Sequence, residues 1–272
     1  MGSFHTFTNR GSTFPPKRSF DLYSLGSVEL MELFHETTSY IQGVRIEVVT
    51  DRRKHGSREE HPATTIGLAL QKPIIRIVDS LDKGQRIEAI IHELAHLLLV
   101  YRDGLGVVGR RIPRHGDSGD VFRFFMSMRG DWVYLLGQIA NTVHHLILVD
   151  YLKKEYGIES SLHLRLLHHN FGIIANDNSR DKESLYAKGL IAFEYERLIG
   201  KVDRVINIFH QTESFWQAYH SAQKYFGRYG FGSIPTPLSY EENILSFLEA
   251  LGYQKENFVF FPEGERDFCL NI

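Results

Sequence analysis

The stretch that decides the fold is Ile87-Glu-Ala-Ile-Ile-His-Glu-Leu-Ala-His-Leu-Leu98, in which apolar residues occupy most positions. Asp82 and Gln85 precede it with the spacing of a capping box, in which each side chain satisfies a main-chain group at the start of a helix. We therefore predict a buried helix over residues 82–101. The two histidines and the glutamate inside it are costly to bury unless they are paired or bind a metal ion.

This predicted helix carries the pattern His-Glu-x-x-His at His92, Glu93 and His96. A spacing of four residues places both imidazoles on one face, one turn apart, which suits two ligands of a tetrahedral zinc ion. Glu93 is next to a ligand, where it can take a proton from a water bound to that ion. The pattern predicts a zinc centre with His92 and His96 as ligands and Glu93 as the general base.

Residues 73–101, an extended segment followed by the metal-binding helix, resemble the zincin superfamily of zinc metallopeptidases. The resemblance implies zinc (Zn2+) as the cofactor and a peptide or protein as the substrate. It also implies that the strand beside the helix is the edge that binds an extended substrate, and residues 73–78 match that strand.

The third zinc ligand does not follow from the common patterns of this superfamily. Metzincins continue His-x-x-Gly-x-x-His, but Leu99 and Arg102 stand at those positions. Gluzincins take a Glu from a downstream helix, but the next Glu after Glu93 is Glu155, which excludes the short thermolysin-like spacing. The third ligand is therefore a His or Asp in that gap, or a residue much further on.

A long helix predicted over residues 131–156 is the best source of this ligand, because it is apolar on one face and partly apolar on another. His145 and Asn141 are spaced i, i+4 and point the same way. We predict His145 as the third ligand, with Asn141 beside it to orient the ligand or the substrate. Asp150 lies on the apolar face and is either a ligand or the partner of a metal-bound histidine. The alternatives for the third ligand are His144, Asp150, Glu194, Glu196 and, in a loop rich in Gly and Arg, His115.

The rest of the sequence predicts one mainly helical α+β domain with a small sheet of about three strands packed on the metal-binding helix. Residues 1–20 form an extended N-terminal segment, and residues 21–272 form the zincin-like domain, with a helical C-terminal part from about residue 158. The predicted strands are 44–49, 64–70, 73–78 and, near the C-terminus, 257–262. Further helices are predicted at 27–42, 183–199, 202–226 and 240–251, and 103–129 as a long loop or broken helix.

The composition limits the functions open to the chain. Lys and Arg total 31 against 33 Asp and Glu, and this net charge of -2 gives no reason to expect nucleic acid or an acidic membrane as a partner. The single cysteine, Cys269, excludes intramolecular disulfides and a zinc cage of cysteines. The apolar runs are too short to span a membrane, and the start lacks the apolar part of a secretory signal, so we expect a cytoplasmic protein.

The sequence therefore predicts a zinc-dependent metallohydrolase, in particular a peptidase. The alternative is a regulatory or protein-binding module that keeps a zincin scaffold without turning over peptides, because the metal site does not need the residues after Gly157. Among those residues, His163, His168 and His169 lack carboxylates or cysteines at matching spacing, and we expect them to be structural or surface histidines.

Overall fold

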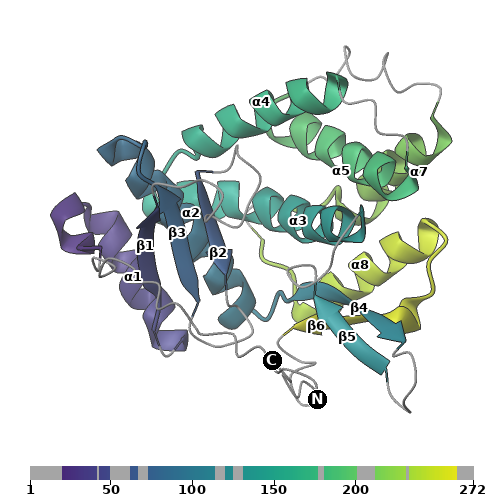
Figure 1. Ribbon diagram of the computed structural model, residues 1–272, viewed down its shortest axis with the longest axis horizontal. Coiled ribbons are helices and arrows are strands. Elements are labelled where there is room, and N and C mark those ends of the chain that lie inside the picture. Colours follow the sequence, from purple (N-terminus) through teal and green to yellow (C-terminus); the bar gives the residue numbers. More distant parts are fainter. Residues whose placement is uncertain are drawn as a thin grey trace, which may run out of the picture.

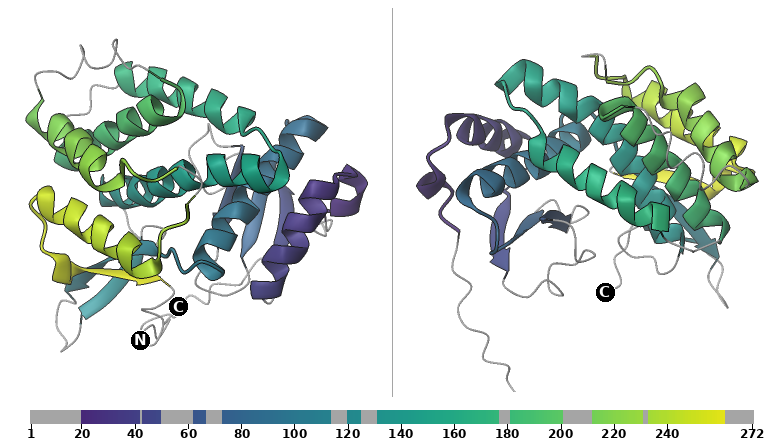
Figure 2. Two further views of the ribbon diagram at one scale, coloured as in Figure 1. Left: turned by 180° about the vertical axis from the view of Figure 1, so that it is seen from behind. Right: turned by 90° about the horizontal axis from the view of Figure 1, so that it is seen from above.

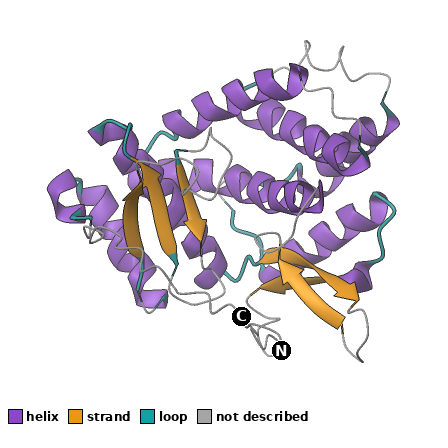
Figure 3. Ribbon diagram, in the orientation of Figure 1, coloured by secondary structure: helices purple, strands orange, loops and turns teal. Residues whose placement is uncertain are grey.

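The computed structural model describes residues 20–41, 43–49, 62–66, 73–113, 120–124, 131–176, 181–200, 212–230 and 233–261. Over these residues the chain forms seven α-helices and two small sheets (Figures 1 and 3). The predicted mainly helical α+β class is confirmed. The two sheets lie apart, and the long helix α3 packs against β4 of the second sheet (Figures 1 and 2). Among the described helices, none combines the length and the apolar composition needed to cross a membrane.

The first sheet contains the three strands that were predicted before the helix with His92 and His96, although residues 67–70 of the strand predicted at 64–70 lie outside the described part. They are β1 (Arg45–Val49), β2 (Ala63–Ile66) and β3 (Ile74–Val78), in the order β1-β3-β2. Strand β1 is parallel to β3 and β2 is antiparallel to it, so β3 is the central strand. The expectation that 73–78 form the edge for a substrate is therefore wrong: β2 covers that edge of β3 and is itself an outer strand.

Helix α2 (Lys83–Tyr101) forms as predicted and packs against β2 and β3. Asp82 accepts from the main chain of Gln85 at 2.8 Å, and the Gln85 side chain accepts from the main chain of Asp82 at 3.2 Å, which confirms the capping box. Helix α1 (Val28–Tyr40) begins after the N-cap Ser27 and packs along α2. A short 3₁₀ helix, η1 (Leu22–Leu25), precedes it.

Helix α3 (Asp131–Tyr156) also matches its predicted bounds and ends at Gly157, whose positive φ of 66° favours glycine. Its last turns are tied to the ends of α1 and α2. Arg102 donates to Glu36 at 2.6 Å and to the Tyr151 hydroxyl at 2.8 Å, and the Tyr156 hydroxyl also donates to Glu36. This polar network fixes α3 relative to the helix that carries His92 and His96.

The C-terminal half is helical, as predicted from about residue 158. It contains α4 (Ser161–Asn176), α5 (Lys182–Leu198), α7 (Glu213–Phe226), α8 (Pro237–Ala250) and the 3₁₀ helix η5 (Lys255–Asn257). Every residue of α5 from Ser184 to Tyr195 is buried, because α5 lies between α3, α4 and α7. Helix α8 begins at Pro237 with Thr236 as its N-cap, so the expected start near Ser239 is corrected. Of the helix predicted at 202–226, residues 202–211 lie outside the described part.

The second sheet was only partly predicted. It contains β4 (Val107–Pro113), β5 (Asp120–Phe124) and β6 (Phe258–Phe261), all antiparallel, in the order β5-β4-β6. The final strand matches the predicted one at 257–262. The loop or broken helix expected at 103–129 is wrong for residues 107–113 and 120–124, because β4 pairs with β5 and, across the chain, with β6. Residues 114–119 and 125–129 lie outside the described part.

Gly189 lies where α5 packs directly against the backbone of α7. A Cβ added there would lie 2.6 Å from the carbonyl oxygen of Phe215. We expect Gly189→Ala to lower the free energy of unfolding by about 1–3 kcal/mol, because the two helices would have to separate. Urea denaturation measures this, with Gly172→Ala as the control. Gly172 is exposed on α4 with nothing within 4 Å of an added Cβ, so alanine should be neutral or stabilise by up to about 1 kcal/mol. Equal effects would contradict the packing described here.

Candidate metal centre

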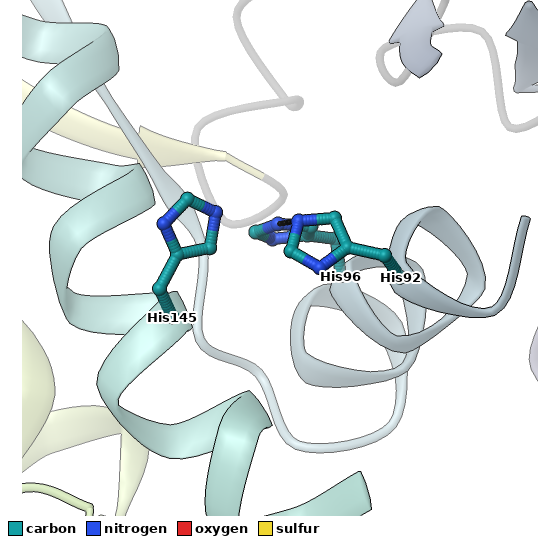
Figure 4. A group of neighbouring side chains, drawn as sticks. All are labelled: His92, His96 and His145. Carbon is teal, nitrogen blue, oxygen red and sulfur yellow. Dashed lines mark hydrogen bonds between the residues drawn. The ribbon is translucent and has the colours of Figure 1, made fainter. Parts of the chain in front are cut away.

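The three histidines predicted as ligands lie together between α2 and α3 (Figure 4). His92 and His96 come from neighbouring turns of α2, and His145 comes from α3. Each offers one nitrogen such that all three atoms lie within 4.8 Å of one another. The ring of His145 is 5.0 Å from that of His92 and 5.1 Å from that of His96, centroid to centroid. These side chains could hold a metal ion.

The spacing of the two α2 histidines fits a shared ion. Their Nε2 atoms are 3.1 Å apart. Two nitrogens bound to one zinc ion at about 2.05 Å, with a tetrahedral angle between them, are about 3.3 Å apart. A hydrogen bond between the two nitrogens therefore places a proton where a metal ion would bind both. Imidazole ligands suit zinc, copper, iron and nickel, so the donor set limits the metal without fixing it.

His144 supports His96 from the side away from His92. Its Nδ1 is 3.1 Å from Nδ1 of His96, and its Nε2 is 3.1 Å from the carbonyl oxygen of Leu105. The Tyr240 hydroxyl, 3.2 Å from the same Nε2, donates to the carbonyl oxygen of Gly106. His144 Nε2–H is therefore the donor to Leu105, and His144 Nδ1 accepts from His96 Nδ1–H. This tautomer leaves the lone pair of His96 on Nε2, the atom that faces His92.

Burial keeps this pair of imidazoles neutral. Desolvation, together with the neighbouring His145, lowers the pKa of His144 to about 3. Desolvation and the surrounding histidines also lower the pKa of His96. Only the neutral form of an imidazole binds a metal ion, so the surroundings already favour the form that coordination requires.

Glu194 on α5 supports His145 in the same way. Its Oε1 lies 2.7 Å from His145 Nδ1, and its Oε2 accepts from the Thr142 hydroxyl at 2.9 Å and from Gln138 at 3.1 Å. Burial alone would raise the pKa of this carboxyl, which is 1% exposed, but its contacts with His145 and His163 hold the pKa below the usual value. The carboxylate accepts from His145 Nδ1–H and thereby leaves the lone pair of His145 on Nε2.

Glu93, the predicted base, is held by the first sheet. Its Oε2 accepts a hydrogen bond of 2.6 Å from the Thr65 hydroxyl on β2. Burial raises the pKa of Glu93 to about 7, although hydrogen bonds from Thr65 act in the opposite direction. A divalent cation nearby would lower this pKa again. Thr65 therefore fixes the Glu93 carboxylate against an outer strand.

The remaining candidates have other positions. Asn141 is exposed one turn before His145, Asp150 is half-buried further along α3, and Glu196 accepts from the Tyr219 hydroxyl. Among the described residues, no metal-capable group contains Asp150 or Glu196. His115 lies outside the described residues. Glu194 belongs to a second such group, with His145 and His163, whose ligand atoms also lie within 4.8 Å.

For two residues of this centre, the sequence did not predict the contact with His145 that the structure shows. His163, expected to be structural or at the surface, has its ring centroid 4.0 Å from that of His145. Glu194 was predicted only as an alternative third ligand; in the structure its Oε1 is hydrogen-bonded to the candidate ligand His145. Its one available signal is a carboxylate inside the apolar run Leu190-Ile-Ala-Phe-Glu194, which requires a buried partner.

No family model matches this chain, and neither a curated protein nor a solved structure is detectably similar to it.

The hydrogen bond from His145 to Glu194 leads to a prediction about metal affinity. Glu194→Gln should weaken zinc binding about 10- to 100-fold, because the amide lacks the charge that orients and polarises His145. Competition with a chromophoric chelator measures the dissociation constant. Glu196→Gln, two residues along the same helix, should leave it unchanged. Equal dissociation constants for the two variants would show that Glu194 has no such role.

Proposed function

We propose that this protein is a zinc-dependent hydrolase that cleaves peptide bonds, built on a zincin-like scaffold. The observation that carries the proposal is the convergence of His92, His96 and His145, with the two Nε2 atoms on α2 only 3.1 Å apart. The tautomers set by His144 and Glu194 support it, because they direct the lone pairs of His96 and His145 to Nε2.

Zinc fits this donor set. Catalytic zinc sites typically have three protein ligands, often imidazoles, and keep a fourth position for water or substrate. When bound, zinc would supply a Lewis acid that polarises the substrate carbonyl and makes water a nucleophile near neutral pH. The outer neighbours also match what such sites need, since each of His96 and His145 has its second nitrogen in a hydrogen bond.

Glu93 is the proposed general base. It takes a proton from the attacking water and passes it to the leaving nitrogen. Two elements hold its carboxylate in place for this proton transfer, since α2 sets it next to His92 in the chain and Thr65 on β2 donates a hydrogen bond to it. Because base and two candidate ligands share one helix, their relative positions are set by helix geometry rather than by a loop.

Strand β2 is the proposed binding edge for an extended peptide. Among the described strands, only β3 pairs with it, and it contacts the predicted base through Thr65. A peptide that pairs with the other edge of β2 would have its main chain fixed by hydrogen bonds. This assignment replaces the one made for residues 73–78.

A digest of cell proteins, analysed by mass spectrometry, tests the proposal without knowledge of the substrate. The peptides are incubated with the protein as purified, with the protein after removal of metal by a chelator, and with the chelated protein after zinc is restored. New peptide ends should appear in the first and third samples only. Stoichiometric zinc without cleavage in any sample would contradict a peptidase and favour the regulatory or protein-binding alternative.

A further inference from the structure

His163, on the first turns of α4, touches three members of the candidate metal centre. Its ring stacks on that of His92, with centroids 4.9 Å apart and an angle of 21° between the planes, and lies 4.0 Å from the ring of His145. Its Nε2 is buried, lies 3.6 Å from Oε1 of Glu194 and has no hydrogen-bond partner. A buried imidazole nitrogen beside a carboxylate is most stable as a donor, so Nε2–H is the favoured tautomer.

The start of α4 is fixed relative to the metal-binding helix. Glu88, one turn before His92 on α2, accepts from the Ser161 hydroxyl at 2.9 Å and from the main-chain N–H of Leu162. The carboxylate therefore caps α4 immediately before His163. This contact places the ring of His163 against that of His92, so the position of His163 is set by two packed helices.

We infer that His163 is a positioning residue of the metal centre: its ring braces His92, and its Nε2–H becomes the fourth donor to Glu194 when a metal ion is bound. The inference rests on the proposed metal site. Nε2 of His92 and Nε2 of His96 are already 3.1 Å apart, and the nitrogen of His145 lies within 4.8 Å of the α2 ligand atoms. His145 is therefore the ligand whose position would adjust to the separation of about 3.3 Å between two ligands of a tetrahedral ion. Oε1 of Glu194 is bonded to His145 and lies 3.6 Å from Nε2 of His163, so a shortening of about 0.6 Å would make the contact with His163 a hydrogen bond.

The geometry favours this role over coordination of a second ion by His163. Glu194 Oε1 and His145 Nδ1 are 2.7 Å apart, which is a hydrogen bond and shorter than the separation of about 3.3 Å between two ligands of one tetrahedral ion. A second ion would have to break that bond. As a donor, His163 instead adds to the set that already stabilises the Glu194 carboxylate.

Three variants of His163 distinguish the contribution of its ring from that of its N–H donor. His163→Gln keeps an N–H near the position of Nε2 but lacks the ring, His163→Phe keeps a ring without a donor, and His163→Ala lacks both. We expect zinc affinity to fall about 10- to 100-fold for alanine and by less for glutamine and phenylalanine. The visible spectrum of the Co2+ form should change in all three, since it reports the geometry around the ion. His169→Ala, an exposed histidine on the same helix, should bind zinc and Co2+ as the wild type does.

Metal affinity and spectrum distinguish this role from a structural one, which would lower the thermal stability of the metal-free variants without changing either. If the wild type binds one zinc ion and the three variants match it in affinity and Co2+ spectrum, the inference is overturned while the metal site stands. Two ions per wild-type chain, with one lost in His163→Gln and His163→Ala, would overturn it by making His163 a ligand. If the wild type binds no zinc, both the inference and the proposed function fail.

Discussion

Replacing His96 with alanine should abolish stoichiometric zinc binding, the largest effect that we expect on metal content. The change removes one of three imidazoles and also leaves His144 Nδ1 without its donor, His96 Nδ1–H. The loss of affinity should exceed the factor of about 10 to 100 that is typical of residues outside the ligand set. The zinc content of the dialysed protein, measured by inductively coupled plasma mass spectrometry, tests this expectation.

The same variant should lose its stabilisation by zinc. A ligand that binds only the folded state, present at about 1,000 times its dissociation constant, raises the free energy of unfolding by about 4 kcal/mol. We expect an increase of that order on adding zinc to the wild type and none for His96→Ala. His220→Ala, an exposed histidine on α7, is the matched control and should respond like the wild type. If His96→Ala retains one zinc ion per chain, the site lies elsewhere.

Replacing Glu93 with glutamine should have the largest effect on hydrolysis. The side chain keeps its size and can still accept from Thr65, so fold and zinc content should be preserved. Glutamine cannot take the proton of the attacking water, and general-base assistance is typically worth about 10² to 10⁴ in rate. The rate of cleavage of a peptide found in the digest experiment should fall by at least that range. Glu155→Gln, an exposed carboxylate at the end of α3, should keep full activity.

Two other outcomes for Glu93→Gln would each carry a clear meaning. A variant that cleaves peptides at the wild-type rate would remove Glu93 from the mechanism. A variant that loses its zinc would make Glu93 a metal ligand and contradict the division of roles between it and His92.

The elements that carry the candidate ligands could be predicted because their signals are local. The capping box of Asp82 and Gln85 and the apolar run after it define α2, and the long apolar stripe closed by Gly157 defines α3. His145 was preferred because its helix is apolar on one face and partly apolar on another, and the structure brings it together with the α2 histidines. Local sequence patterns were sufficient to predict a helix when the residues that stabilise it lie within one or two turns of each other.

The parts that were missed depend on contacts between distant segments. Strand β4 carries Arg110 and Arg111, so it lacks the alternation of a half-buried strand, and it forms because β5 and the C-terminal β6 pair with it. Glu194 and His163 join the centre only because α5 packs on α3 and Glu88 anchors α4. Likewise, the order β1-β3-β2, which makes β2 an outer strand, is not encoded in any one strand.

The most direct test of the proposed zinc centre is an anomalous-diffraction map at the zinc absorption edge, from crystals of the protein grown with one equivalent of zinc. We expect one strong peak per chain, about 2.1 Å from Nε2 of His92, His96 and His145. Nδ1 of His145 should stay hydrogen-bonded to Glu194 in the same crystals. The proposed centre is contradicted if no peak appears between these three histidines, or if the peak lies between His163 and Glu194.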